Sequence, residues 1–223
     1  PHPTAAGVVE RPASPLALAP ELARLGLPAR AHIPEVSTFE HLATAARRFP
    51  HKTAIQFFDV AISYAELLRD VERMAGHLQA QGVQRGDRVL VISQNCPQYI
   101  VGYLAALRAD ACFVPVNDML LADEVRHIVN DSGTVVAFVA QELLAQVAPV
   151  LGNSSLRHVV VHAYGDTLAG QANTGQLPDW LREPSSAAAL PAGAVRWADA
   201  LAQAPAPRPL TAGPDDLCMM PYT

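Results

Sequence analysis

The sequence predicts an α/β fold in which helices flank a mainly parallel sheet. Short apolar runs rich in β-branched residues alternate along the chain with segments of helical periodicity. Several of these runs are apolar throughout, which is typical of strands that are buried on both faces. The helical segments between them are roughly ten or more residues long, and a connection of that length is needed between parallel strands.

Composition places the chain among folded globular proteins. Of its 223 residues, 50% are hydrophobic and 17% are charged, so the chain can bury a sizeable core. The formal net charge is -5, and the basic residues form no stripe along the sequence. We therefore expect no nucleic-acid partner.

The cysteines and the apolar runs indicate the compartment. Cys96, Cys112 and Cys218 are far apart, odd in number and surrounded by apolar residues, which favours buried free thiols in a reducing environment. No stretch approaches the roughly 18 consecutive apolar residues of a membrane-spanning helix. Residues 1–4 do not begin a secretory signal. We expect a cytoplasmic protein without a transmembrane segment.

The N-terminal part of the chain, residues 1–36, contains many prolines and is expected to form an extended arm on the surface. At most a short helix over residues 20–25 is expected in it, because Gly26 ends the helical pattern.

Two helices are expected to begin with capping boxes. Residues 37–40, Ser-Thr-Phe-Glu, start a helix over residues 38–49. Residues 63–66, Ser-Tyr-Ala-Glu, start a second one, in which apolar residues recur at helical spacing until Gly82 ends it. An apolar run at residues 54–58 lies between the two and predicts a strand.

A buried strand and another helix follow. Residues 85–87, Arg-Gly-Asp, form a turn into a β-branched run at residues 88–93. Residues 95–97 then begin a helix, with proline at an early position where a helix does not need its N–H group. Its apolar stripe is expected to consist of Tyr99, Ile100, Tyr103, Leu104 and Leu107.

The alternation continues further along the chain. Strands are expected at residues 111–116, 135–139 and 158–161, and helices at residues 122–131 and 143–151. Residues 164–214 are rich in alanine, glycine and proline, apart from Trp180 and a short helical run at residues 197–201, which predicts a surface insert or a partly mobile segment. Residues 216–220 resume a strand-like run.

No sequence-local catalytic motif is present, such as a Gly-x-Ser-x-Gly elbow, a His-Glu-x-x-His pair or a Cys-x-x-Cys pair. His158 and His162 would lie on one face of a strand but far apart, so we do not expect a metal site there. The charged pairs at residues 47–48, 72–73 and 123–124 are expected to be solvated.

Two segments resemble the adenylate-forming enzymes, which include acyl- and aryl-CoA synthetases, luciferases and the adenylation domains of peptide synthetases. These segments are residues 62–67, Ile-Ser-Tyr-Ala-Glu-Leu, and residues 82–89, Gly-Val-Gln-Arg-Gly-Asp-Arg-Val. Further segments at residues 95–99, 103–107, 113–117 and 130–133 are similar to successive landmarks of the family in the same order. The similarity covers roughly residues 38–162 and the final strand. It implies that residues 37–223 are the incomplete N-terminal part of the large AMP-binding domain, with residues 164–214 as an insert.

The end of the chain resembles the lead-in to the family's phosphate-binding loop. The resemblance rests on residues 215–217, Asp-Asp-Leu, the apolar run after them, and Tyr222 and Thr223. A loop of glycine and hydroxyl residues can direct several N–H and O–H groups at phosphate oxygens. Thr223 is the only residue of that loop in the chain, so the resemblance makes it the candidate nucleotide-binding residue. It assigns no catalytic or metal-binding residue here.

The chain departs from the family pattern at two positions. Asp110 stands after a helix where relatives usually have glycine, and we expect a left-handed turn there that aspartate tolerates. Asp118 stands where relatives often have proline after the asparagine that corresponds to Asn117.

The resemblance implies a two-step reaction that forms an acyl-adenylate from a carboxylic acid and ATP and then transfers the acyl group to coenzyme A, with Mg²⁺ on the phosphates. We expect a fatty acid as the substrate. The alternatives are an aryl-CoA ligase or another adenylate-forming enzyme, and a non-catalytic α/β interaction module. The 223-residue chain alone is expected to be inactive, to bind none of these molecules tightly, and to form homo-oligomers.

Overall fold

The computed structural model describes residues 24–26, 34–168 and 177–222. The chain divides into two compact units, Pro1–Glu35 and Val36–Thr223. In the first unit, Gly26 has a φ of 66°, which fits the helix end expected there. Most of the expected arm, including residues 20–23 of its helix, lies outside the described residues.

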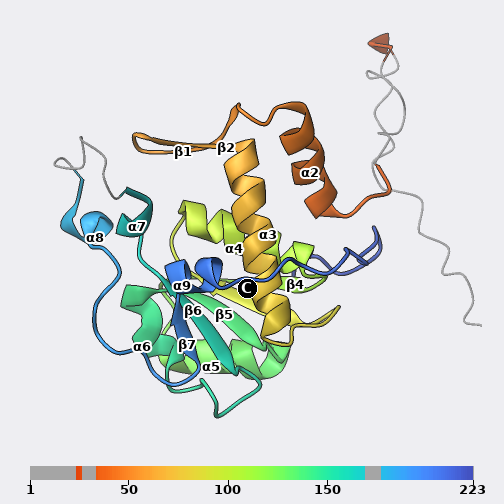
Figure 1. Cartoon of the computed structure of the whole chain (residues 1–223). Helices are drawn as coiled ribbons and strands as arrows, with labels where there is room; N and C mark the ends of the chain where they lie inside the picture. The colour runs from red at the N-terminus through yellow and green to blue at the C-terminus, as the bar shows by residue number, and fades with distance from the viewer. Residues whose placement is uncertain (1–23, 27–33, 169–176, 223) are drawn as a thin grey trace, which may run out of the picture. The chain divides into compact units, whose positions relative to one another are not determined.

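A five-stranded parallel sheet forms the centre of the second unit (Figure 1). The strands, in spatial order, are β4 (Cys112–Val116), β3 (Arg88–Ile92), β5 (Val136–Ala140), β6 (His158–His162) and β7 (Ala194–Arg196). Strand β3 pairs with β4 on one side and with β5 on the other, so the chain reverses its direction of travel across the sheet at β3. The predicted α/β class with a parallel sheet is confirmed.

Helices cover both faces of the sheet. Helices α3 (Tyr64–Ala80), α4 (Pro97–Arg108) and α9 (Trp197–Ala202) pack on one face, and α5 (Ala122–Ser132) and α6 (Leu144–Val147) pack on the other. Val89 and Val91 of β3 belong to the first core, whereas Leu90 and Ile92 belong to the second. This alternation follows because successive side chains of a strand point to opposite faces.

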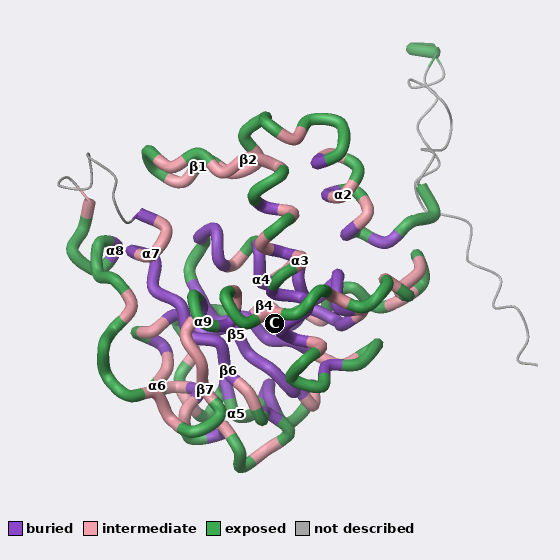
Figure 2. The backbone as a smooth tube through the Cα atoms, viewed as in Figure 1, coloured by how far each residue is buried: buried purple, intermediate pink, exposed green. Residues whose placement is uncertain are grey.

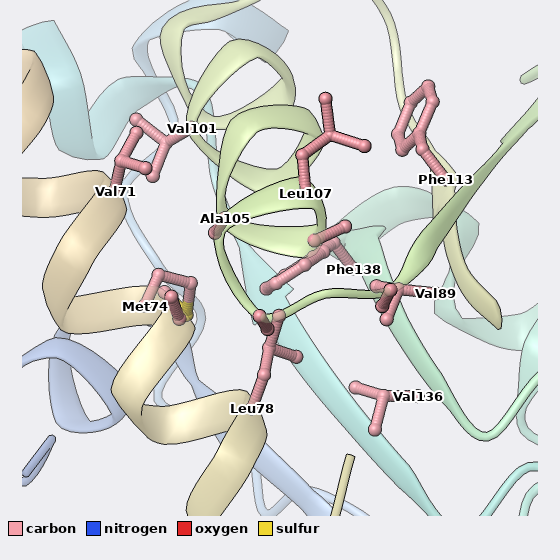
Figure 3. Packing of buried hydrophobic residues seen from close by; sticks show 14 of the residues in the cluster. Val71, Met74, Leu78, Val89, Val101, Ala105, Leu107, Phe113, Val136 and Phe138 are labelled. Carbon is pink, nitrogen blue, oxygen red and sulfur yellow. The ribbon is translucent and has the colours of Figure 1, made fainter. Parts of the chain in front are cut away.

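The core under α3 and α4 is closely packed. Figure 3 shows Met74 and Leu78 of α3 facing the aromatic ring of Phe138, with side chains of α4 above the sheet. A Cβ atom added at Gly102 of α4 would lie 3.0 Å from the Phe138 ring, so the absence of a side chain lets α4 approach β5. The buried stretch of tube in Figure 2 follows β5 and β6.

The helix starts follow the predicted caps to different extents. At the start of α3, the Ser63 hydroxyl accepts from the Glu66 N–H at 3.3 Å, and Glu66 Oε2 accepts from the Ser63 N–H at 2.8 Å. At α2 (Thr38–Arg48), Glu40 accepts from the Ser37 N–H at 2.9 Å. The buried Ser37 hydroxyl has no hydrogen-bond partner among the described residues, so only half of that box forms.

The strand expected at residues 54–58 is confirmed as β1 (Thr53–Phe57), and it forms a separate antiparallel hairpin with β2 (Val60–Ser63). Two other sequence predictions need correction. The helix expected over residues 143–151 contracts to a 3₁₀ turn and the four residues of α6. Ile100 is 37% exposed. The buried face of α4 is centred on Val101 and Ala105, and the small residues on it determine which side of α4 meets the sheet.

The segment over residues 164–214 contains more regular structure than its composition suggests. Residues 169–176 lie outside the described residues. The remainder includes α7 (Gly165–Leu168), α8 (Asp179–Arg182), β7 and α9. Strand β7 was not predicted, because three half-buried residues give no readable period.

The strand expected at residues 217–220 reduces to a single parallel bridge between Met219 and Phe113 of β4. The Phe113 N–H donates to the Cys218 carbonyl, and the Met220 N–H donates to the Phe113 carbonyl, both at 2.9 Å. No residue from 211 to 222 is buried, so side-chain burial does not extend the pairing.

Candidate functional site at the sheet edge and in the segment leading to Thr223

The carboxyl ends of β3, β5 and β6 lie beside one another, because these strands are parallel neighbours. The next two strands along the chain, β4 and β5, lie on opposite sides of β3. In doubly wound sheets, ligands bind at the carboxyl ends of the strands where such a reversal occurs. The residues that follow these strands are therefore the first candidates for a functional site.

A buried polar cluster occupies this position. The Ser93 hydroxyl after β3 lies 3.0 Å from Nε2 of His162, the last residue of β6, and 2.9 Å from the Gln94 carbonyl. If the hydroxyl donates to that carbonyl, Nε2 carries the proton and donates to Ser93, and Nδ1 is left as a lone pair. Nδ1 has no hydrogen-bond partner among the described residues. A buried lone pair without a partner is less unfavourable than a buried N–H without one, which supports this tautomer.

The electrostatics of this cluster do not suit acid–base catalysis. Burial lowers the pKa of His162 to about 3, so the imidazole is neutral and acts as a donor. Burial also raises the pKa of the Cys96 thiol, whose sulfur lies 3.8 Å from His162 Nε2. Cys96 instead caps α4, because its sulfur accepts from the Tyr99 N–H at 3.4 Å. The cluster joins the ends of β3 and β6 and activates no nucleophile.

Further hydrogen bonds join the same two chain segments. The Gln94 N–H donates to the Tyr164 hydroxyl at 3.1 Å, and the Gln98 amide donates to the Ala163 carbonyl at 3.0 Å. The buried Oε1 atom of Gln98 has no partner among the described residues. It lies beside a half-open groove of about 350 Å³ between α4, α7, α9 and β2. The loop after β3 is thus fixed on the residues after β6.

A second candidate is the segment that leads to Thr223. It passes α3 closely, since a Cβ atom at Gly76 would lie 1.9 Å from the Pro205 carbonyl oxygen. It then runs beside β4 and reaches the bridge at Met219. The Tyr222 hydroxyl donates to Asp131 Oδ2 at 2.6 Å. Thr223 itself lies outside the described residues.

Two side chains hold the segment at the base of the sheet. Asp110 has a φ of 63°, so the expected left-handed turn is present, and its carboxylate accepts from the Thr211 and Ala212 N–H groups at 2.9 and 2.8 Å. Arg85 forms a bidentate ion pair with Asp216, with contacts of 2.7 to 3.2 Å. The Gly213 N–H and the Arg85 guanidinium hold the pKa of Asp216 below its usual range.

The histidines and cysteines singled out in the sequence differ in burial and in their contacts. His158 and His162 share one face of β6, and His158 contacts His77 of α3 with 2.9 Å between their Nε2 atoms. No local sequence pattern indicates the contact between His77 and His158, because the two residues are 81 positions apart. Cys96 and Cys112 are buried free thiols, but Cys218 is exposed, contrary to expectation, because its segment packs only against the sheet edge.

Comparison with known proteins decides the family. Residues 42–223 match the family model described as AMP-binding enzyme. The chain belongs to the AMP-binding enzyme family.

Relatives of this AMP-binding chain are named for different acids. A feruloyl-CoA synthase of Amycolatopsis sp is 36% identical over 178 residues, which is 80% of this chain and 29% of that protein. A long-chain-fatty-acid–CoA ligase of Bacillus subtilis (strain 168) is 33% identical over 106 residues, 48% of this chain and 19% of that protein. The chain therefore spans less than a third of the length of these relatives.

Solved structures show the same fold. An anthranilate CoA ligase in complex with anthranoyl-AMP matches with a TM-score of 0.69 at 18% identity, over 86% of this chain and 33% of that one. A Mycobacterium tuberculosis fatty acyl CoA synthetase matches with a TM-score of 0.63 at 23% identity, over 84% of this chain and 32% of that one. These likenesses place the AMP-binding chain's parallel sheet within the fold of the family.

Proposed function

We propose that this chain is the N-terminal part of an ATP-dependent acid–thiol ligase. In the proposed reaction, the carboxylate oxygen of the acid attacks the α-phosphorus of ATP, and pyrophosphate leaves. The thiol of coenzyme A then attacks the carbonyl carbon of the acyl-adenylate, and AMP leaves. The observation that carries the proposal is the family match over residues 42–223.

In the proposed enzyme, the described residues hold the chain that leads to the phosphate-binding loop. Residues 37–223 are the first part of the large nucleotide-binding domain, preceded by the arm over residues 1–36 and interrupted by the insert over residues 164–214. Thr223 is the first residue of the phosphate-binding loop. The bridge at Met219 and the contacts of Asp110 and Asp216 hold the chain that leads to it.

Magnesium would neutralise the phosphates of the bound nucleotide. Within the described ranges, no three His, Cys, Asp or Glu side chains gather into a metal-binding group. We therefore assign no described residue to the metal and derive no step through it. We place the protein in the cytoplasm, which its three free thiols support. Among the described residues, no helix has the length and apolarity needed to cross a membrane.

We propose a fatty acid as the first candidate substrate, which the long-chain-fatty-acid–CoA ligase relatives support. An aromatic acid is the second candidate. It is favoured by the 36% identity to a feruloyl-CoA synthase over 178 residues, a longer match than the 106 residues shared with the Bacillus ligase.

Pyrophosphate exchange into ATP tests the proposed activity. The full-length protein is assayed with a panel of fatty acids of different lengths and with ferulate and hydroxybenzoates. We expect acid-dependent exchange with members of one class, and CoA-ester formation when coenzyme A is added. If no acid gives exchange faster than the no-acid blank, the ligase proposal is contradicted and an α/β interaction module is favoured.

The 223-residue chain is the matched control in that assay. We expect it to give no exchange and to bind ATP weakly, because it carries only the first residue of the proposed phosphate-binding loop. Exchange by this chain above the no-protein blank would show that the nucleotide site lies within these residues.

A further inference from the structure

The segment that leads to Thr223 is positioned without buried side chains. Every described residue from 211 to 222 is exposed or half-buried. It forms a single bridge with β4, at Met219. In a segment of this kind, polar contacts determine where the backbone lies, because there is little packing to do so.

Asp110 makes the densest set of these contacts. Its Oδ1 accepts from the Thr211 N–H at 2.9 Å and from the Ala212 N–H at 2.8 Å. Its Oδ2 accepts from the Thr211 hydroxyl at 2.7 Å and from the Thr211 N–H at 3.2 Å. Hydrogen bonds to a charged acceptor are shorter and stronger than bonds between neutral groups.

The backbone of Asp110 brings the carboxylate to this position. Helix α4 ends at Arg108, and Ala109 and Asp110 turn the chain into β4, with Asp110 in the left-handed region at a φ of 63°. Glycine is the residue that this conformation favours, and a non-glycine residue there is strained. Glycine would relieve the strain but supplies no acceptor. The carboxylate is therefore the part of Asp110 that glycine cannot replace.

A second contact, between Arg85 and Asp216, begins at a turn that is hydrogen-bonded to Asp110. The Gly86 N–H donates to the Asp110 carbonyl at 2.9 Å, and this bond ties the turn before β3 to the turn before β4. Arg85 extends from the first turn to Asp216, and Asp110 extends from the second to Thr211. Asp216 also accepts from the Gly213 N–H at 2.6 Å, so the two contacts enclose one short stretch of chain.

We propose that Asp110 is a positioning residue for nucleotide binding: its carboxylate fixes residues 211–212, and thereby holds the segment that presents Thr223 and the phosphate-binding loop. This rests on the proposed function, in which that loop begins at Thr223. Asp110 acts through the backbone of the segment and touches no phosphate itself.

Substitutions at position 110 separate the carboxylate from the backbone turn. Asp110→Gly keeps the left-handed conformation without strain and removes both carboxylate acceptors. Asp110→Asn tolerates the same conformation and keeps Oδ1 for the two N–H groups. Asp59→Gly is a matched control, since Asp59 is exposed in the distant turn between β1 and β2.

In the full-length protein, we expect Asp110→Gly to raise the KM for ATP in pyrophosphate exchange by about tenfold, the effect of losing one or two net hydrogen bonds to a charged group. The KM for the acid should change by less than about twofold, because the contact holds the segment that leads to the proposed nucleotide site. Asp110→Asn should recover most of the loss, and Asp59→Gly should match the wild type.

Amide hydrogen exchange in the 223-residue chain gives a second readout that does not depend on activity. Asp110→Gly should speed exchange of the Met220 N–H, which donates to the Phe113 carbonyl, while the amides of β5 remain protected. Thr211→Val removes only the hydroxyl donor and should give a smaller increase. It also tests the contact with Asp110 left in place.

The outcomes separate this inference from the proposed function. An inactive wild-type protein with faster Met220 exchange in Asp110→Gly would overturn the ligase proposal and leave the structural contact intact. An active wild type whose KM for ATP is unchanged in Asp110→Gly would overturn the positioning role. An equal rise in the KM values for ATP and for the acid would also overturn it, because general destabilisation gives that result.

Discussion

The imidazole rings of His77 and His158 meet between helix α3 and strand β6, with their Nε2 atoms 2.9 Å apart. His77 is 7% exposed. Burial, and secondarily the neighbouring His158, lower the pKa of His77 from 6.5 to about 4, and burial lowers the pKa of His158. One ring must donate to the other, so the pair is stable only while it remains largely unprotonated.

We predict that stability falls in acid through this pair. The unfolded chain binds protons near pH 6.5, whereas folded His77 binds them only near pH 4, so the contribution to stability is complete above about pH 6.5 and is lost as the pH falls towards 4. The slope should reach about 1.4 kcal/mol per pH unit for each extra proton on the unfolded chain. Urea unfolding at several pH values measures it.

His77→Gln should reduce that slope, and the buried His162 should maintain part of it, because its pKa is lowered to about 3. His127→Gln is the control, since His127 is exposed on α5. A slope that is the same in His77→Gln as in the wild type would show that the pair does not contribute.

We predict that Gly76→Ala destabilises the chain. Alanine is the better helix former by about 1 kcal/mol, so propensity alone would stabilise α3. The added Cβ would lie 1.9 Å from the Pro205 carbonyl oxygen, and the chain over residues 204–207 must move away. We expect a net loss of about 1–3 kcal/mol in the free energy of unfolding. Gly213→Ala is the control, since the added Cβ would lie 4.0 Å from Asp216 Oδ2.

We predict that one thiol of the native chain reacts quickly with a thiol reagent. Cys218 is exposed, whereas Cys96 and Cys112 are buried and burial raises the pKa of both thiols. A disulfide-exchange reagent should therefore label one cysteine in the folded chain and three in denaturant. Cys218→Ser should abolish the fast phase, and a fast phase that persists in this variant would contradict the structure.

We predict that the 223-residue chain self-associates through its edge at Met219. This residue pairs with β4 on one side, no described strand pairs with it on the other, and Leu217 is 60% exposed beside it. Unpaired backbone groups and apolar side chains at a sheet edge favour pairing with another chain. Light scattering at high micromolar concentration should report dimers or larger species.

Met219→Lys should shift the equilibrium towards monomer, because a charged side chain disfavours edge pairing. Met119→Lys is the matched control, since Met119 is 81% exposed but lies after β4 and away from the bridge. A wild-type chain that is strictly monomeric at these concentrations would show that the edge is already closed.

The sequence by itself determined the alternation of elements. The capping box at residues 63–66, the apolar run at residues 88–93 and the proline at position 97 predicted α3, β3 and α4 within a few residues. These signals are readable because hydrogen bonds within a few residues and short apolar runs act locally. The resemblance to adenylate-forming enzymes rests on the same local segments. It also identifies Asp110 as a residue that stands where relatives usually have glycine.

Only the tertiary structure decided which distant residues meet. The contacts of His77 with His158, Asp110 with Thr211 and Arg85 with Asp216 join residues that are 81, 101 and 131 positions apart. No local pattern specifies such a partner. Strand β7 forms because β6 offers an edge on which three half-buried residues can pair. The apolar residues before Thr223 predict a strand. Among the described residues, β4 alone pairs with this segment and residues 211–222 include no buried side chain, so pairing is limited to one bridge.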